Sequence, residues 1–194
     1  MKIKILIGLV LLVILVNGCV SEESSIGTPQ FTKGSGYAKQ LLLTKNEVES
    51  LGFDVDEEGS AVSLVTENVE SEANGYFYFV DGVEDVSDLS NSIKIFKDLE
   101  GANSYYEGEL YEIKTVIPFR EKTERRIISS DIGSKSYAVR DIVYTDESKR
   151  TIDFLVFNLI FIKGKTFVDI YLVSRGDNYS NELLELGRIV ESKT

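Results

Sequence analysis

The chain has 194 residues, and 21 Lys and Arg against 32 Asp and Glu give it a net charge of −11 at pH 7. It contains no His, no Trp and a single Cys. This composition excludes a disulfide within the chain, zinc held by His or Cys, haem held by His, and catalysis by a His base. The acidic balance disfavours nucleic acid as a partner, because phosphate backbones would be repelled. We therefore predict no metal, no cofactor and no enzymatic activity.

The N-terminus combines two lysines, Lys2 and Lys4, with an apolar run over residues 5–16. That run is too short for a membrane span, which needs about 20 residues, so it predicts a signal peptide. The run ends in Val16-Asn17-Gly18-Cys19, which resembles the lipobox of prokaryotic lipoproteins. The resemblance implies cleavage before Cys19 and alkylation of its sulfur by a lipid that holds the protein on the membrane. The alternatives are a plain secretory signal that leaves Cys19 as a thiol, and an uncleaved anchor.

Three segments follow from this interpretation. Residues 1–18 are the signal peptide, and their removal takes away two lysines and no acid, leaving a net charge of −13. Residues 19–36 are rich in Ser, Gly and Glu and poor in apolar side chains, which predicts a flexible tether. Residues 37–194 are long enough for a single domain with a substantial core.

The first element of this domain is a short helix over residues 45–51. Thr44 and Glu47 have the spacing of a capping box, and Gly52 ends the segment. Residues 54–59 then imitate the opening of a calcium loop, with acids at its first, third and fifth positions. Val62 and Val65 stand where later ligands are needed, so we favour a solvated acidic turn.

Residues 61–69 and 75–80 are predicted strands, and residues 81–92 an acidic loop. The second strand carries the aromatic run Tyr76 to Phe79. Such a stripe could be a ligand platform, but in an extended segment it more often belongs to the sheet core, and we favour the core.

A strand over residues 92–97 leads into a predicted helix from Asp98, a favourable N-cap, to residue 115. Gly101 and Gly108 weaken this helix slightly. Its apolar face follows the helical period: Leu99, Ala102, Tyr106, Leu110 and Ile113. The basic-rich residues 120–126 are interleaved with acids and predict a solvated loop or strand end.

The second half is predicted to be mostly strand, over residues 135–145, 151–163 and 166–174. If Gly164-Lys165 is a two-residue hairpin turn, Lys163 pairs with Thr166 and the register of both strands is fixed. One face of this hairpin is then wholly apolar and must be covered by helices.

The opposite face mixes apolar and polar groups, among them Asn158, Asp169 and Tyr171. Such a face is either exposed to solvent or the floor of a shallow pocket. These three residues are our candidate binding face, although we favour partial cover by the N-terminal helix without a ligand.

A last helix is predicted over residues 180–191, with Ser180 or Asn178 as its cap. Its inner stripe consists of Leu183, Leu186 and Val190. Asn178-Tyr179-Ser180 is also an N-glycosylation sequon, so Asn178 is a candidate modification site.

Together these elements predict an α+β fold, a mainly antiparallel sheet with helices packed against it. The order of residues 132–139, 161–168 and 183–190 resembles extracytoplasmic sensor-type and PsbP-like domains. In that pattern a Gly-containing turn precedes a strand, a basic-Gly hairpin follows, and a Leu-rich helix ends the domain. The resemblance implies a PsbP-like sandwich that serves as a tethered sensing, binding or assembly module, and it brings no catalytic motif.

Three functions remain open. The first is a lipid-anchored, non-enzymatic binding, sensing or accessory domain at the outer face of the cytoplasmic membrane, with a membrane or envelope protein as a possible partner. The second is the solute-binding subunit of a transporter, for which this chain is short. The third is a hydrolase using carboxylates, although no Gly-x-Ser-x-Gly elbow is present.

Overall fold

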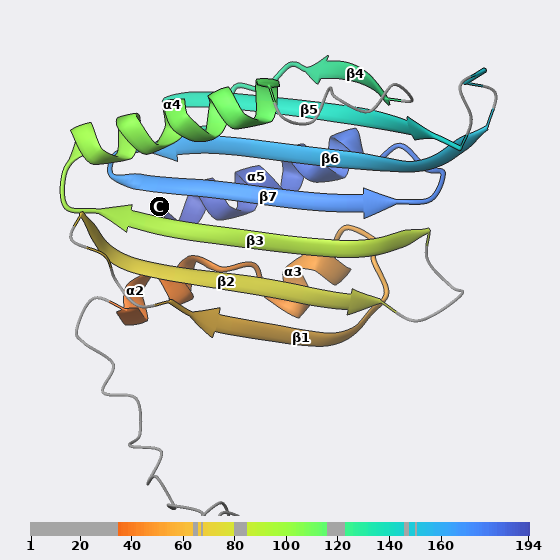
Figure 1. Cartoon of the computed structure of the whole chain (residues 1–194). Helices are drawn as coiled ribbons and strands as arrows, with labels where there is room; N and C mark the ends of the chain where they lie inside the picture. The colour runs from red at the N-terminus through yellow and green to blue at the C-terminus, as the bar shows by residue number, and fades with distance from the viewer. Residues whose placement is uncertain are drawn as a thin grey trace, which may run out of the picture. The chain divides into compact units, whose positions relative to one another are not determined.

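The computed structural model describes residues 35–63, 66, 68–79, 85–115, 123–145, 148–149 and 151–194. The predicted signal peptide, the lipidation site Cys19 and almost all of the tether lie outside this range. The described residues form one seven-stranded antiparallel sheet with the strand order β1-β2-β3-β7-β6-β5-β4 (Figure 1). The strands are β1 (Val55–Val62), β2 (Val69–Phe79), β3 (Val86–Phe96), β4 (Thr123–Ile128), β5 (Lys135–Tyr144), β6 (Ile152–Lys163) and β7 (Thr166–Ser174). The helices are α2 (Ser35–Leu41), α3 (Lys45–Glu49), α4 (Leu99–Thr115) and α5 (Ser180–Lys193), so the predicted α+β class is confirmed, with strand in excess.

The β6–β7 hairpin lies near the centre of the sheet and has the predicted register. Lys163 pairs with Thr166 across the turn, and Gly164 adopts a φ of +59°, which a Gly tolerates without strain. Asn158 therefore stands opposite Tyr171, as the sequence predicts.

One face of the sheet, which we call the back face, is covered by α2, α3 and α5 (Figure 1). Its core includes the predicted apolar face of the hairpin and the predicted stripe of α5, where Leu183, Leu186 and Val190 are fully buried. The capping box of α3 is present as well, since Thr44 and Glu47 bond each other's backbone N–H groups. Helix α2 begins two residues before the predicted domain start at residue 37, because Ala38 and Leu41 pack into this core.

The opposite face, which we call the front face, is covered at one end by α4 (Figure 1). Asp98 caps this helix as predicted, accepting the N–H of Gly101 at 2.7 Å. Ala102, Tyr106 and Ile113 are buried with three residues of the hairpin, Ile160, Ile162 and Phe167. Our expectation that the N-terminal helix covers this face is therefore wrong, because the buried Val48 of α3 belongs to the back-face core.

Arg125 holds the far end of α4. Its guanidinium donates to both oxygens of Asp141 at 2.7 and 2.6 Å, and to the carbonyl of Ile113 in the last turn of the helix. Asp141 is only 1% exposed. Residues 123–126 of the segment that we expected to be a solvated loop or strand end belong to β4, and Arg125 is not solvated but contributes a bidentate, nearly buried ion pair, because it points toward the sheet and the helix end.

The N-terminal strands differ most from the prediction. The acidic segment 54–59 belongs mainly to β1, β1 ends at Val62 and β2 begins at Val69, and β3 begins at Val86 within the expected loop. Strand β1 pairs only with β2, so it is an edge strand, where exposed charges are favourable. The aromatic run is divided between the two faces: Phe77 is buried, whereas Tyr76 and Tyr78 are 41% and 59% exposed on the front face.

Two helical glycines test this packing with the same substitution. A Cβ on Gly187 in α5 would lie 2.5 Å from Leu159 and 2.8 Å from Ile132, both wholly buried, whereas a Cβ on Gly108 in α4 would meet nothing within 4 Å. We expect Gly187→Ala to lower the free energy of unfolding by about 1–3 kcal/mol through overpacking. We expect Gly108→Ala to raise it by about 0.5–1 kcal/mol, because Ala favours the helix. Urea unfolding followed by circular dichroism measures both values, and shifts of the same sign would contradict the two environments.

Candidate functional site

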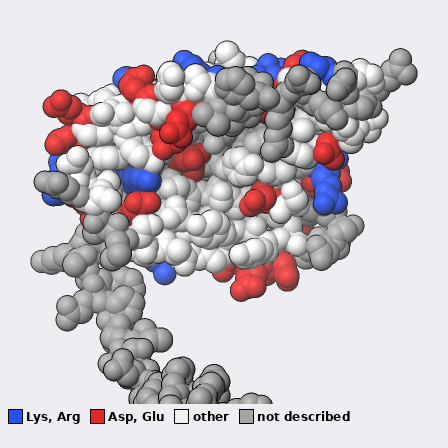
Figure 2. Space-filling view, viewed as in Figure 1, with Lys and Arg blue, Asp and Glu red and all other residues white. Residues whose placement is uncertain are grey.

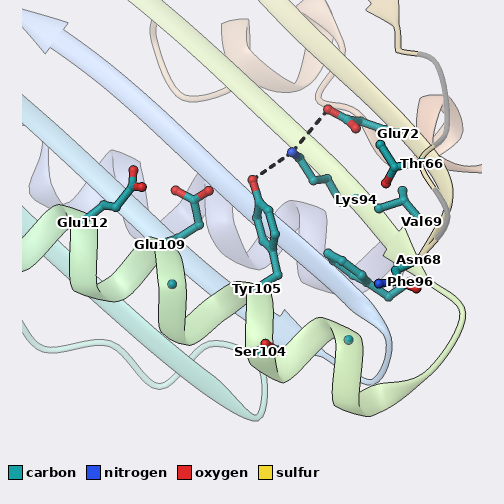
Figure 3. A pocket seen from close by; sticks show the side chains of 12 residues that line it. Thr66, Asn68, Val69, Glu72, Lys94, Phe96, Ser104, Tyr105, Glu109 and Glu112 are labelled. Atoms are coloured by element: carbon teal, nitrogen blue, oxygen red, sulfur yellow. Dashed lines mark hydrogen bonds and ion pairs between the residues drawn. The ribbon is translucent and has the colours of Figure 1, made fainter.

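Helix α4 carries a second stripe of residues beside the one that packs on the hairpin. Gly101, Ser104, Tyr105, Gly108, Glu109 and Glu112 recur at helical spacing and border a pocket of about 540 Å³ (Figure 3). Strands β2 and β3 and the residues before β2 provide the other wall. That wall consists of Thr66, Asn68, Val69, Glu72, Lys94 and Phe96. A volume of this size is within the range of small-molecule sites.

Lys94 connects the two walls of the pocket. Its ammonium lies 3.4 Å from the carboxylate of Glu72 on β2 and donates to the hydroxyl of Tyr105 on α4 at 2.8 Å (Figure 3). The ammonium is also 4.5 Å from the centroid of the Tyr105 ring, a cation–π distance. Burial raises the pKa of Tyr105, and the neighbouring carboxylate of Glu109 raises it further. The phenol therefore stays protonated at physiological pH and acts as a neutral hydroxyl between Lys94 and the helix acids.

The carboxylates of Glu109 and Glu112 are the other charges of the pocket. They extend from α4 on the same side as Tyr105 (Figure 3). Within the described part of the chain, neither forms an ion pair with a basic side chain. Three lining carboxylates and one lysine leave the pocket with a net charge of −2. Figure 2 shows the same face, with several acidic groups over and beside α4.

The candidate binding face predicted from the sequence lies beside this pocket and does not line it. Asn158 donates through its amide N–H to a carboxylate oxygen of Asp169 at 2.9 Å, and Tyr171 is partly buried opposite Asn158. Burial raises the pKa of Asp169 to about 6; the Asn158 hydrogen bond and Lys94 act in the opposite direction, while Glu109 adds to the increase. The charges of two pocket residues, Glu109 and Lys94, therefore act on the carboxyl group of Asp169. Whether this face binds a ligand stays a prediction.

The residues that line this pocket were not predicted from the sequence as a site. The signal on α4 was available, because two glycines, a serine, a tyrosine and two glutamates share one helical stripe. Glu72 and Lys94 could not be assigned to the site without the register of β2 and β3, in which they are directly paired.

The other predicted sites have different outcomes. Asn178 is exposed before α5, and its side-chain oxygen accepts the hydroxyl of Ser180 at 2.6 Å, so its glycosylation stays a prediction. Cys19 lies outside the described residues. No group of His, Cys, Asp and Glu side chains that could hold a metal ion occurs in the part of the chain that the structure describes.

Comparison with known proteins shows a similar fold. No protein-family model and no curated protein matches this chain. Among solved structures, it is similar to the extracellular domain of PknH from Mycobacterium tuberculosis, with a TM-score of 0.58 and 11% sequence identity. The match covers 82% of this chain and 95% of that one. At this identity the likeness concerns the fold alone, and the PsbP-like part of our expectation stays a prediction.

Among the described helices, none has both the length and the hydropathy that a membrane span requires.

Asp169 gives the front face a pH dependence that can be measured. The pKa of Asp169 rises from 3.8 to about 6 on folding. The contribution of its protonated carboxyl group to the free energy of unfolding is therefore complete below about pH 4 and is lost as the pH rises through 6. We expect Asp169→Asn to match the wild type near pH 4 and to exceed its free energy of unfolding near pH 7, by at most about 3 kcal/mol. The new amide can also donate to the side-chain oxygen of Asn158, which has no hydrogen-bond partner among the described residues.

Urea unfolding of both proteins across this pH range measures the difference, which cancels the contributions of other titrating groups. A difference that stays constant with pH would contradict the assignment of the raised pKa to Asp169.

Proposed function

We propose that this protein is a lipid-anchored, non-enzymatic domain outside the cytoplasm that binds a small ligand in the α4 pocket. The observation that carries the proposal is the pocket itself, in which a polar stripe of α4 faces Glu72 and Lys94 across about 540 Å³. The helix is buried mainly through Ala102, Tyr106 and Ile113, and of the pocket stripe Tyr105 also packs against that core, on Phe96 and Phe167. Glu109 and Glu112 belong to neither core cluster, and charged groups that converge on a cavity without a packing role are typical of ligand sites.

The proposed location rests on the sequence and is supported by the fold. The apolar run and Cys19 have the order expected for a lipoprotein signal, so Cys19 would hold the domain at the outer face of the cytoplasmic membrane. An extracellular domain with a similar fold, that of PknH, supports an extracytoplasmic place for this chain. A membrane or envelope protein that responds to the ligand-bound domain would complete a sensing role.

Two further observations favour binding over the alternatives. A solute-binding subunit usually closes two lobes around its solute, whereas the described residues form a single sheet. A hydrolase using carboxylates would be favoured by two acids converging in a deep apolar cleft. The α4 pocket does hold three carboxylates, but Glu72 is already paired with Lys94, and Thr66, Asn68 and Ser104 make the lining polar rather than apolar.

The anchor can be tested in bacterial cells that produce the full-length chain. We expect the wild type to enter the detergent phase of a membrane extract and to carry a lipid-modified N-terminal cysteine in mass spectra, because acyl chains partition strongly into membranes. Cys19→Ser should lose both properties, whereas Asn17→Ala, which moves the site closer to the lipobox pattern, should keep them. A wild-type protein that retains Met1 or carries an unmodified Cys19 would exclude the anchor.

Ligand binding can be tested with a panel of small polar metabolites of both charges. We expect at least one of them to raise the melting temperature of the full-length wild type and to leave Gly108→Leu unchanged. This variant projects a side chain from the pocket stripe at a place where a Cβ meets nothing within 4 Å, so it should fold at least as well as the wild type. The proposal fails if no compound distinguishes the two proteins.

A further inference from the structure

We infer that the ligand of the α4 pocket is a small aliphatic di- or triamine without a carboxylate group. This inference rests on the proposed ligand-binding function and adds the chemical class of the ligand. Three features of the pocket support it: the carboxylates that have no basic partner among the described residues, the open space at Gly108, and the environment of Lys94.

The charges of the pocket are not balanced. Lys94 already lies 3.4 Å from Glu72, so its positive charge is largely offset within the wall. Glu109 and Glu112, three residues apart on α4, have no basic partner in the described part of the chain. An entering ammonium group would therefore meet two carboxylates that can accept its hydrogen bonds, whereas an entering carboxylate would be repelled by both.

Gly108 provides an observation that does not depend on charge. It lies within α4, where glycine weakens a helix, and on the stripe that borders the pocket. Gly187 in α5 is required by close packing, but a Cβ on Gly108 would meet no protein atom within 4 Å. Packing thus gives no reason for the glycine, whereas a ligand that approaches the helix backbone between Tyr105 and Glu109 does.

Lys94 shows how this pocket holds an amine. Its ammonium has a carboxylate, a phenol oxygen and the ring of Tyr105 as neighbours, at 3.4, 2.8 and 4.5 Å. Phe96 packs on Tyr105 with ring centroids 5.4 Å apart and adds an apolar surface against which methylene groups can lie. An ammonium group of the ligand, carried on a short aliphatic chain, would find the same kinds of group as Lys94 does, in Glu109, Glu112 and the Tyr105 side chain.

Calorimetry of the full-length chain in neutral detergent tests the inference with three probes of equal length: 1,5-diaminopentane, 1,5-pentanediol and glutarate. Near neutral pH we expect the wild type to bind only the diamine. The double variant Glu109→Gln/Glu112→Gln should bind it at least about tenfold more weakly, because two charge-assisted hydrogen bonds are lost. Gly108→Leu should not bind it. Glu100→Gln removes one of the negative charges of α4 from an exposed position outside the pocket and should bind like the wild type.

The outcomes separate this inference from the proposed function. Binding of glutarate or pentanediol that is lost in Gly108→Leu would overturn the amine and leave the pocket as a ligand site. Diamine binding that persists in Gly108→Leu, or that falls as much in Glu100→Gln as in the double variant, would show diffuse attraction to an acidic surface and overturn the inference. If no probe binds, the inference fails as well, and the metabolite panel decides the proposed function independently.

Discussion

The β6–β7 hairpin is apolar on both faces at the end that carries its turn, and both faces must therefore be removed from water. On the back face Leu159, Phe161 and Val168 are wholly buried, and on the front face Ile160, Ile162 and Phe167 are as well. Burying one such side chain is worth about 1.5–3 kcal/mol, so neither face can be left uncovered at small cost. Helices are consequently required on both sides of the same strands, and α5 and α4 fill these positions.

The need to cover the front face determines the position of α4 more strongly than the helical propensity of its own sequence does. Two glycines lower its helical propensity, and Leu99 and Tyr111 remain largely exposed. The helix is held by its buried stripe, by Asp98 at its start and by Arg125 at its end. Because these contacts use only part of its circumference, the neighbouring stripe overhangs β2 and β3, where the sheet surface changes from apolar to polar. The pocket thus results from a helix that is placed by one face and borders, with its adjacent face, a cavity over β2 and β3.

Elements whose signals are local could be predicted from the sequence. The capping box at Thr44 and Glu47, the N-cap Asp98, the two-residue turn at Gly164 and the stripe of α5 each depend on residues a few positions apart, and all are present. Strand β1 could not be predicted in this way, because it is an edge strand with mostly exposed residues, several of them acidic, and has no alternation of apolar and polar positions.

The site depends on contacts between distant parts of the chain, and this limits what the sequence reveals. Glu72, Lys94 and Tyr105 meet only after the register of β2 and β3 is set and α4 has crossed the sheet. Arg125 was misinterpreted for the same reason, since both of its partners belong to other elements. The candidate face of Asn158 and Asp169 was found because the hairpin register alone places these residues together.

Asp169 connects the face that the sequence identified to the pocket that it did not. The charges of Glu109 and Lys94 shift the pKa of Asp169, so the charge state of the pocket and the protonation of Asp169 are coupled. An ammonium bound beside Glu109 would offset a negative charge that raises the pKa of Asp169 and would add a positive charge that lowers it. By thermodynamic reciprocity, ionisation of Asp169 would then strengthen the binding of the cation. Because the pKa of Asp169 is about 6, this coupling would operate just below neutral pH.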